Sequence, residues 1–182
     1  MLVKIHGYRL SKCQSGLTLI ELVLVMVVMS LISVPIGNYL SGSVKAFSSS
    51  KDSINGLNEL RYSMTRISQE IRDVDHDGSQ YQIATPGTDM TDTTFTFINT
   101  STNNISLHYD GGQLTISDSS VGVSAFTLAN QVTAFDFNYY QQDGITPAVD
   151  GSDLIFVEFE LSLQENGVSF QARSRVALRD KN

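Results

Sequence analysis

Cysteine is almost absent from this chain of 182 residues. The single cysteine, Cys13, lies among the first 16 residues, so the remainder of the chain cannot form an internal disulfide. Burial of apolar side chains must therefore hold the folded part of the chain together.

Basic residues are also scarce, with 12 Lys and Arg against 19 Asp and Glu and a formal net charge of −7. Three of them, Lys4, Arg9 and Lys12, precede Gly16, and no acidic residue does. Without residues 1–16 the chain has 9 basic against 19 acidic residues. This balance argues against nucleic acid as a partner, because phosphate contacts need clustered Lys and Arg.

Recognisable catalytic motifs are lacking as well. The sequence contains no GxSxG, no HExxH, no Gly-rich phosphate loop and no Cys/His cluster. The histidines His6, His76 and His108 lie far apart along the chain. We therefore expect no enzymatic activity and no catalytic cofactor.

The most prominent feature that is present is an apolar run over residues 17–36 with only four polar members. Twenty residues at a helical rise of about 1.5 Å span roughly 30 Å, the thickness of a bilayer core. The run predicts a transmembrane helix over residues 17–37. The basic residues before it place its N-terminal side in the cytoplasm.

Three interpretations of this run compete. A secretory signal peptide would have a shorter apolar region, with a cleavage site such as residues 41–43. A plain membrane anchor explains the length and the flanking charge but not Glu21, since a carboxylate costs about 2.5–3.5 kcal/mol at the bilayer centre. The third interpretation gives Glu21 a role.

The third interpretation is supported by a resemblance. A basic leader, Gly16 and the sequence LTLIE over residues 17–21, joined to an apolar helix, resemble the signal of type IV pilins and type II secretion pseudopilins. The resemblance implies that a prepilin peptidase removes residues 1–16 by cutting after Gly16 and then methylates the new amine of Leu17. The family usually has phenylalanine where Leu17 stands.

The resemblance also implies assembly with other pilin or pseudopilin subunits at an inner-membrane platform, driven by a separate ATPase. In the filament, the new amine of one subunit can meet Glu21 of its neighbour. Pairing the two charges in an apolar bundle removes a desolvation cost and penalises wrong registers. The alternative is that Glu21 merely reaches the lipid headgroups.

A second helical segment is predicted over residues 38–75. Pro35 and Gly37 predict a kink, local unwinding or a helix end, and residues 41–53 predict exposed helix or a loose joint. Apolar residues then return at helical spacing and predict a stripe that packs on a sheet. The members of this stripe are Ile54, Leu57, Leu60, Met64, Ile67, Ile71 and Val74.

An acidic stretch follows this helix. Asp73, Asp75 and Asp77, followed by Gly78, match the opening of a calcium loop and are candidate metal ligands. The match fails at the twelfth position, Ala84, which offers no bidentate acid. The alternative is a solvated helix exit in which these carboxylates bond to the backbone.

Residues 76–182 predict a β-rich head, because apolar residues alternate with polar ones around turn signals. A hairpin is expected around residues 110–112, and another around Asn166-Gly167. The second turn pairs residues whose numbers sum to 333. Leu163 then faces Phe170 and Leu161 faces Ala172, while Glu160 meets Arg173 and Glu158 meets Arg175 on the solvated face.

These features predict an α+β, pilin-like fold, in which a long N-terminal helix packs its amphipathic second half on an antiparallel sheet. The expected function is structural: a minor pilin or pseudopilin that primes or caps a type IV pilus or a type II secretion pseudopilus. The expected location is the inner membrane of a Gram-negative-type bacterium, with a periplasmic head, and then the filament. The alternative is a monomeric, membrane-anchored periplasmic binding protein.

Overall fold

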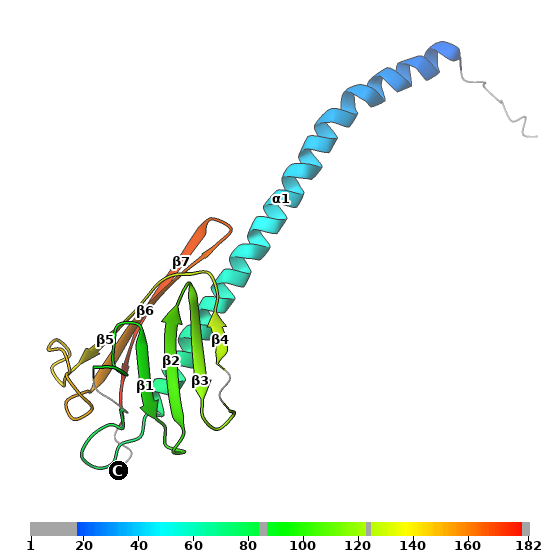
Figure 1. Ribbon diagram of the computed structural model, residues 1–182. Helices are drawn as coiled ribbons and strands as arrows, with labels where there is room; N and C mark the ends of the chain where they lie inside the picture. The colour runs from blue at the N-terminus through cyan, green and yellow to red at the C-terminus, as the bar shows by residue number, and fades with distance from the viewer. Residues whose placement is uncertain (1–17, 84–86, 123–124, 180–182) are drawn as a thin grey trace, which may run out of the picture. The chain divides into compact units, whose positions relative to one another are not determined.

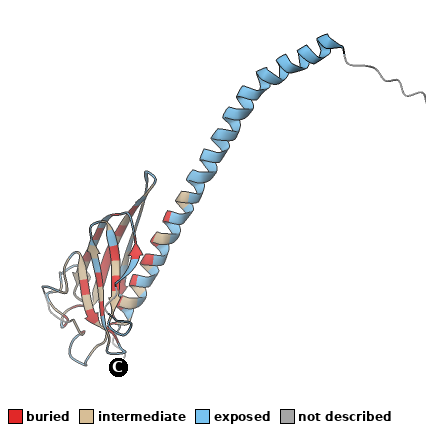
Figure 2. Cartoon of the chain, turned by 45° about the vertical axis from the view of Figure 1, so that its right-hand side comes forward, coloured by how far each residue is buried: buried red, intermediate tan, exposed pale blue. Residues whose placement is uncertain are grey.

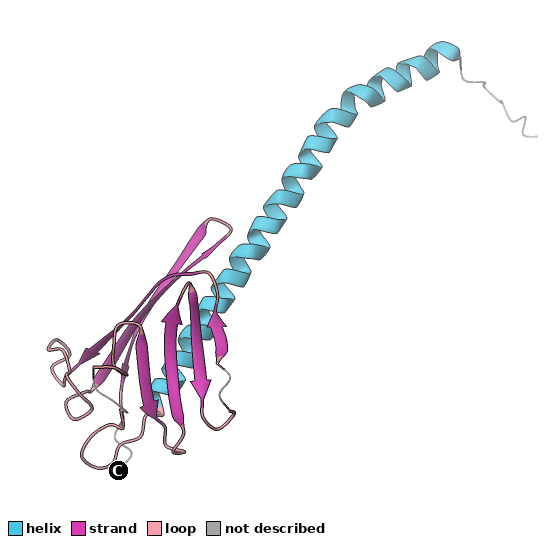
Figure 3. Ribbon diagram, viewed as in Figure 1, coloured by secondary structure: helices cyan, strands magenta, loops and turns pink. Residues whose placement is uncertain are grey.

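The computed structural model describes residues 18–83, 87–122 and 125–179, in which one long helix is followed by seven strands (Figure 1, Figure 3). Antiparallel sheets follow the helix, so the predicted α+β architecture is confirmed. The elements are α1 (Leu19–Arg72), β1 (Thr94–Ile98), β2 (Asn104–Asp110), β3 (Gln113–Asp118), β4 (Phe126–Ala129), β5 (Val132–Tyr140), β6 (Phe156–Glu165) and β7 (Val168–Ala177).

The chain divides into two compact units, residues 1–47 and residues 48–182. In the first unit, α1 continues without interruption through Pro35, and its ribbon curves but does not break (Figure 1). The predicted local unwinding or helix end at Pro35 is therefore wrong. A proline removes only one backbone hydrogen bond, and the residues on both sides remain helical.

In the second unit, the C-terminal part of α1 packs against the sheets, but its buried face differs from the predicted stripe. Ile54 and Leu57 are 57% and 46% exposed. The buried residues of the helix are Gly56, Leu60, Ser63, Ile67 and Ile71.

The reason for the difference is the close approach of the helix to β7. A Cβ on Gly56 would lie 2.6 Å from the ring carbon Cε2 of Phe170. Small side chains therefore occupy the contact, and neighbouring large apolar residues turn outward. The spacing of apolar residues could not predict this buried face, because glycine and serine are not counted among the large apolar residues that define the pattern.

The strands form a four-stranded sheet in the order β1-β2-β3-β4 and a three-stranded sheet in the order β5-β6-β7, with all pairs antiparallel. Both predicted hairpins are confirmed. Gly111 and Gly112 adopt φ of 56° and 86° between β2 and β3. Asn166 and Gly167 adopt 48° and 83° between β6 and β7, as a type I′ turn requires.

The register of the last hairpin is also confirmed, since Leu163 lies opposite Phe170 and Glu158 opposite Arg175. On β6, the side chains of Val157, Phe159, Leu161 and Leu163 are buried on one face. The buried residues, red in Figure 2, lie mainly on the strands and on the adjoining part of α1. The largest fully buried aromatic side chains are Phe95, Phe97 and Phe159.

The other face of β6 departs from the prediction. Glu158 is only 5% exposed, although it was expected on a solvated face. It accepts hydrogen bonds from Arg175 Nε at 2.9 Å and from Arg173, so both arginines converge on one carboxylate. Glu160 lies opposite Arg173, as the register predicts, but the Arg173 guanidinium donates to Glu158, and Glu160 accepts a hydrogen bond from Gln171. Long arginine side chains reach diagonal neighbours, which a pairing register does not specify.

This arrangement makes the stability of the head sensitive to acid. Burial raises the pKa of Glu158, but the bonds from Arg173 and Arg175 outweigh it and hold the pKa below the ordinary value of 4.5. A depressed folded-state pKa stabilises the fold above the unfolded value, and this stability is lost as the pH falls through the folded value. We expect the free energy of unfolding to fall below pH 4.5, and Glu158→Gln to flatten that decline in denaturant titrations. A decline equally steep in the variant would contradict the assignment.

Ser63 fastens α1 to the four-stranded sheet. Its buried hydroxyl lies 2.8 Å from the carbonyl oxygens of both Leu128 and Glu59 and donates to them. Ser63→Ala leaves the Leu128 carbonyl without this donor, which costs about 1–3 kcal/mol of unfolding free energy. Ser68→Ala is the matched control, because Ser68 donates only to Met64 within the helix. Equal losses in denaturant unfolding of both variants would contradict a special role for Ser63.

Candidate assembly site

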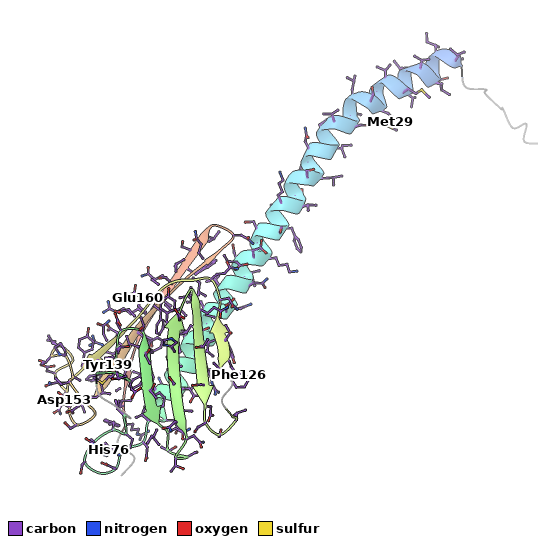
Figure 4. The ribbon with its side chains drawn as sticks, viewed as in Figure 1. Met29, His76, Phe126, Tyr139, Asp153 and Glu160 are labelled. Atoms are coloured by element: carbon purple, nitrogen blue, oxygen red, sulfur yellow. The ribbon has the colours of Figure 1, made fainter. Side chains whose placement is uncertain are left out.

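The N-terminal part of α1 presents apolar side chains on every side. All residues from 18 to 47 are exposed in this chain, including Leu19 at 83% and Leu31 at 71% (Figure 2). Figure 4 shows side chains projecting from the ribbon on both sides around Met29. By length and composition, α1 is the one helix among the described residues that could cross a membrane.

A capping arrangement opens this helix. Thr18 precedes the first helical residue, and its Oγ1 accepts from the backbone N–H of Glu21 at 3.4 Å. In return, Glu21 Oε2 accepts from the backbone N–H and the hydroxyl of Thr18, both at 3.3 Å. This is a capping box, in which two backbone donors that helix geometry leaves unpaired are satisfied reciprocally.

The capping box was missed in the sequence, although its signal, a threonine followed three residues later by a glutamate, is present. Both bonds to Glu21 end on Oε2. Its other oxygen, Oε1, accepts no hydrogen bond from any residue in the described ranges. The carboxylate thus holds the helix start with one oxygen and can accept from a neighbouring molecule with the other.

Two predicted site residues, Gly16 and Leu17, lie outside the described residues, as does Ala84 of the calcium-loop comparison. The three candidate calcium ligands are described, and the carboxylates of Asp73 and Asp77 have separate hydrogen-bond partners. Asp73 accepts from the hydroxyl of Thr100 at 2.7 Å.

Asp77 accepts from the backbone N–H groups of Ser79 and Gln80 at 2.9 and 3.0 Å, and from Gln82 Nε2 at 2.7 Å. These bonds hold the pKa of Asp77 below its usual range. Over residues 18–83, 87–122 and 125–179, no group of three acidic, histidine or cysteine side chains is placed to hold a metal ion. The arrangement of these carboxylates does not support a calcium site, and calcium binding by Asp73, Asp75 and Asp77 stays a prediction.

Comparison with known proteins bears on the N-terminal segment. Residues 11–37 match the prokaryotic N-terminal methylation motif. No similar curated protein was found for the chain.

The match covers the last six residues of the predicted leader, the predicted cleavage position and the apolar run, and it supports a type IV pilin-like prepilin signal. This signal and the pilin-like α+β architecture support a precursor of the type IV pilin or pseudopilin type, and the apolar helix fits a membrane anchor. The prepilin-type signal implies processing by prepilin peptidase and assembly with other pilins.

Proposed function

We propose that this chain is a minor pilin or pseudopilin that primes or caps a type IV pilus or a type II secretion pseudopilus. Prepilin peptidase cuts the precursor after Gly16 and methylates the amine of Leu17. The mature helix then leaves the inner membrane and joins the filament core, with a periplasmic head until assembly. An inner-membrane platform with a separate ATPase supplies the force.

The observation that carries this proposal is the chemistry of Glu21 on the exposed helix. Exposed apolar side chains surround it, and one of its carboxylate oxygens has no bond among the described residues. An apolar surface of this extent needs lipid or other apolar helices around it. In either setting an anion is costly unless a cation meets it.

Cleavage after Gly16 would create that cation. The new amine on Leu17 is positively charged and lies close to Glu21 in sequence. The capping box already engages Oε2 within the chain, so Oε1 is the atom we assign to the amine of an adjacent subunit. A single pair of this kind in an apolar bundle fixes the axial register of neighbouring helices.

The test is mass spectrometry of the mature N-terminus, purified from cells that contain the assembly system. The expected product begins at Leu17 with one methyl group on its amine. Gly16→Val is the matched control, because a branched side chain next to the scissile bond should block the cut. A monomeric, membrane-anchored periplasmic binding protein would keep residues 1–16 or be cut further downstream, and either product would overturn the proposal.

A further inference from the structure

The positive charges of the mature chain are strongly segregated. Between residues 73 and 172 the sequence contains no lysine or arginine but fourteen acidic residues. These are Asp73, Asp75, Asp77, Asp89, Asp92, Asp110, Asp118, Asp136, Asp143, Asp150, Asp153, Glu158, Glu160 and Glu165. Every lysine or arginine after Gly16 lies on α1 or after residue 172. Such a division gives one molecule two surfaces of opposite charge.

Basic residues of α1 and one that follows β7, Arg179, line a groove between α1 and β7. Its apolar floor includes Leu60, Met64 and Ala172, and Arg61 and Arg72 line it from the helix. The groove continues past Gln69, Arg72, Asp73, Ala177 and Arg179.

The arginines that line this groove have no ion-pair partner among the described residues. Arg61, Arg72 and Arg179 are exposed and form no ion pair with any side chain in the described ranges. The other arginines of these two elements are occupied, since Arg66 pairs with Glu70 and the pair on β7 binds Glu158. β7 is also an edge strand of its sheet, so one side of its backbone has no neighbouring strand.

The acidic counterpart lies on two loops at one end of the head. The loop after α1 and the loop between β5 and β6 are joined where Tyr81 N donates to Gly151 O at 2.9 Å. Residues in these two loops, His76 and Asp153, lie at the same end of the head in Figure 4. We refer to residues 75–83, 87–93 and 141–153 as the acidic loops.

The acidic loops hold seven carboxylates, namely Asp75, Asp77, Asp89, Asp92, Asp143, Asp150 and Asp153. Aspartate side chains are ordinarily ionised at neutral pH, and local hydrogen bonds lower the pKa of several in these loops further. Hydrogen bonds from the hydroxyl and backbone of Thr146 and the backbone of Ile145 lower the pKa of Asp143, and bonds from the hydroxyl and backbone of Ser152 lower that of Asp150. The loops therefore present a negative surface at neutral pH.

We propose that the groove between α1 and β7 receives the acidic loops of a second copy of this chain. The inference rests on the proposed filament function. The occupant is a second copy because the same chain carries both complementary surfaces, the groove along residues 57–72 of α1 and the acidic loops from residue 75 onward. A contact between two different surfaces of identical subunits is heterologous and propagates into an open helical array. A priming segment would then contain at least two successive copies.

Cysteine crosslinking tests this contact directly, because the chain's only cysteine lies in the leader. In a Cys13→Ser background, Thr65→Cys places a thiol in the groove and Ser79→Cys places one in an acidic loop; both positions are exposed or line the groove. Oxidation of sheared filaments from the double variant should give a ladder of covalent multimers. Either single variant can give dimers at most. Pairing Thr65→Cys with Thr127→Cys, on exposed β4, is the matched control and should give no ladder.

Charge-reversal variants provide a second test of the contact. Arg61→Glu with Arg72→Glu should reduce the ladder at least tenfold, because like charges across an interface disfavour it. Adding Asp75→Lys and Asp92→Lys to that chain should restore the ladder, since both surfaces are then reversed.

The outcomes separate this inference from the proposed function. If the chain enters sheared filaments but the double variant gives no ladder, the contact is wrong and the function stands. A groove thiol that crosslinks to a protein of different mass overturns the second-copy assignment. If the chain never enters filaments and its N-terminus is unprocessed, both the function and this inference fail.

Discussion

Glu21→Ala is expected to remove the chain from filaments while leaving cleavage after Gly16 intact. The variant loses the acceptor for the amine of the adjacent subunit, which would stay charged and unpaired inside an apolar bundle. Breaking a buried pair by removing one partner costs about 3–5 kcal/mol, which corresponds to roughly two to four orders of magnitude in incorporation. The measurement compares the amount of chain in sheared filaments with the amount of processed chain in the membrane.

Two controls separate the intermolecular role of Glu21 from its role at the helix start. Thr18→Ala removes the hydroxyl of the capping box but keeps the carboxylate. Loss of a helix cap costs about 0.5–2 kcal/mol, so this variant should enter filaments far better than Glu21→Ala. If Glu21→Ala entered filaments as well as the wild-type chain, or if the two variants had equal defects, Glu21 would have no intermolecular role in assembly.

Phe159→Ala should destabilise the head more than any surface change. Phe159 is fully buried on β6, the central strand of its sheet, and its ring centroid lies 6.3 Å from that of Phe137. Truncating a buried phenylalanine removes its burial energy and leaves a cavity, which together cost about 3–5 kcal/mol. Denaturant unfolding of the detergent-solubilised chain gives the value.

Phe126→Ala is the matched control, because Phe126 lies on β4 at 50% exposure (Figure 4). It should change the unfolding free energy by much less. Similar losses for the two variants would show that the head is not held together by the core around β6.

The hairpin registers could be predicted from the sequence because the information is local. Asn166-Gly167 fixes a two-residue turn, and the alternation of residues 157–163 fixes which face is buried. The burial of Glu158 could not be predicted in the same way. It depends on two arginines of β7 converging on one carboxylate, and an alternating pattern assigns that position only to a polar face.

The buried face of α1 shows the same limit. Leu60, Ile67 and Ile71 were predicted correctly from their spacing. Gly56 and Ser63 were not, since their importance comes from the approach of Phe170 and of the Leu128 carbonyl. Leu128 lies 65 positions from Ser63 in the sequence, and Phe170 lies even further from Gly56.

The sequence by itself determined the apolar run, the prepilin-type signal, the lone carboxylate within it and the turns of the head. Each of these depends on residues within a few positions of one another, where helix rise, turn geometry and transfer free energy act directly. Only the tertiary structure decided that Gly56 contacts β7 and Ser63 contacts β4, and where the buried Glu158 finds its partners. It also decided that arginines of α1 and of the C-terminal segment share one groove. These features arise when segments distant in sequence pack together, because burial and charge pairing depend on neighbours that the chain brings into contact only by folding.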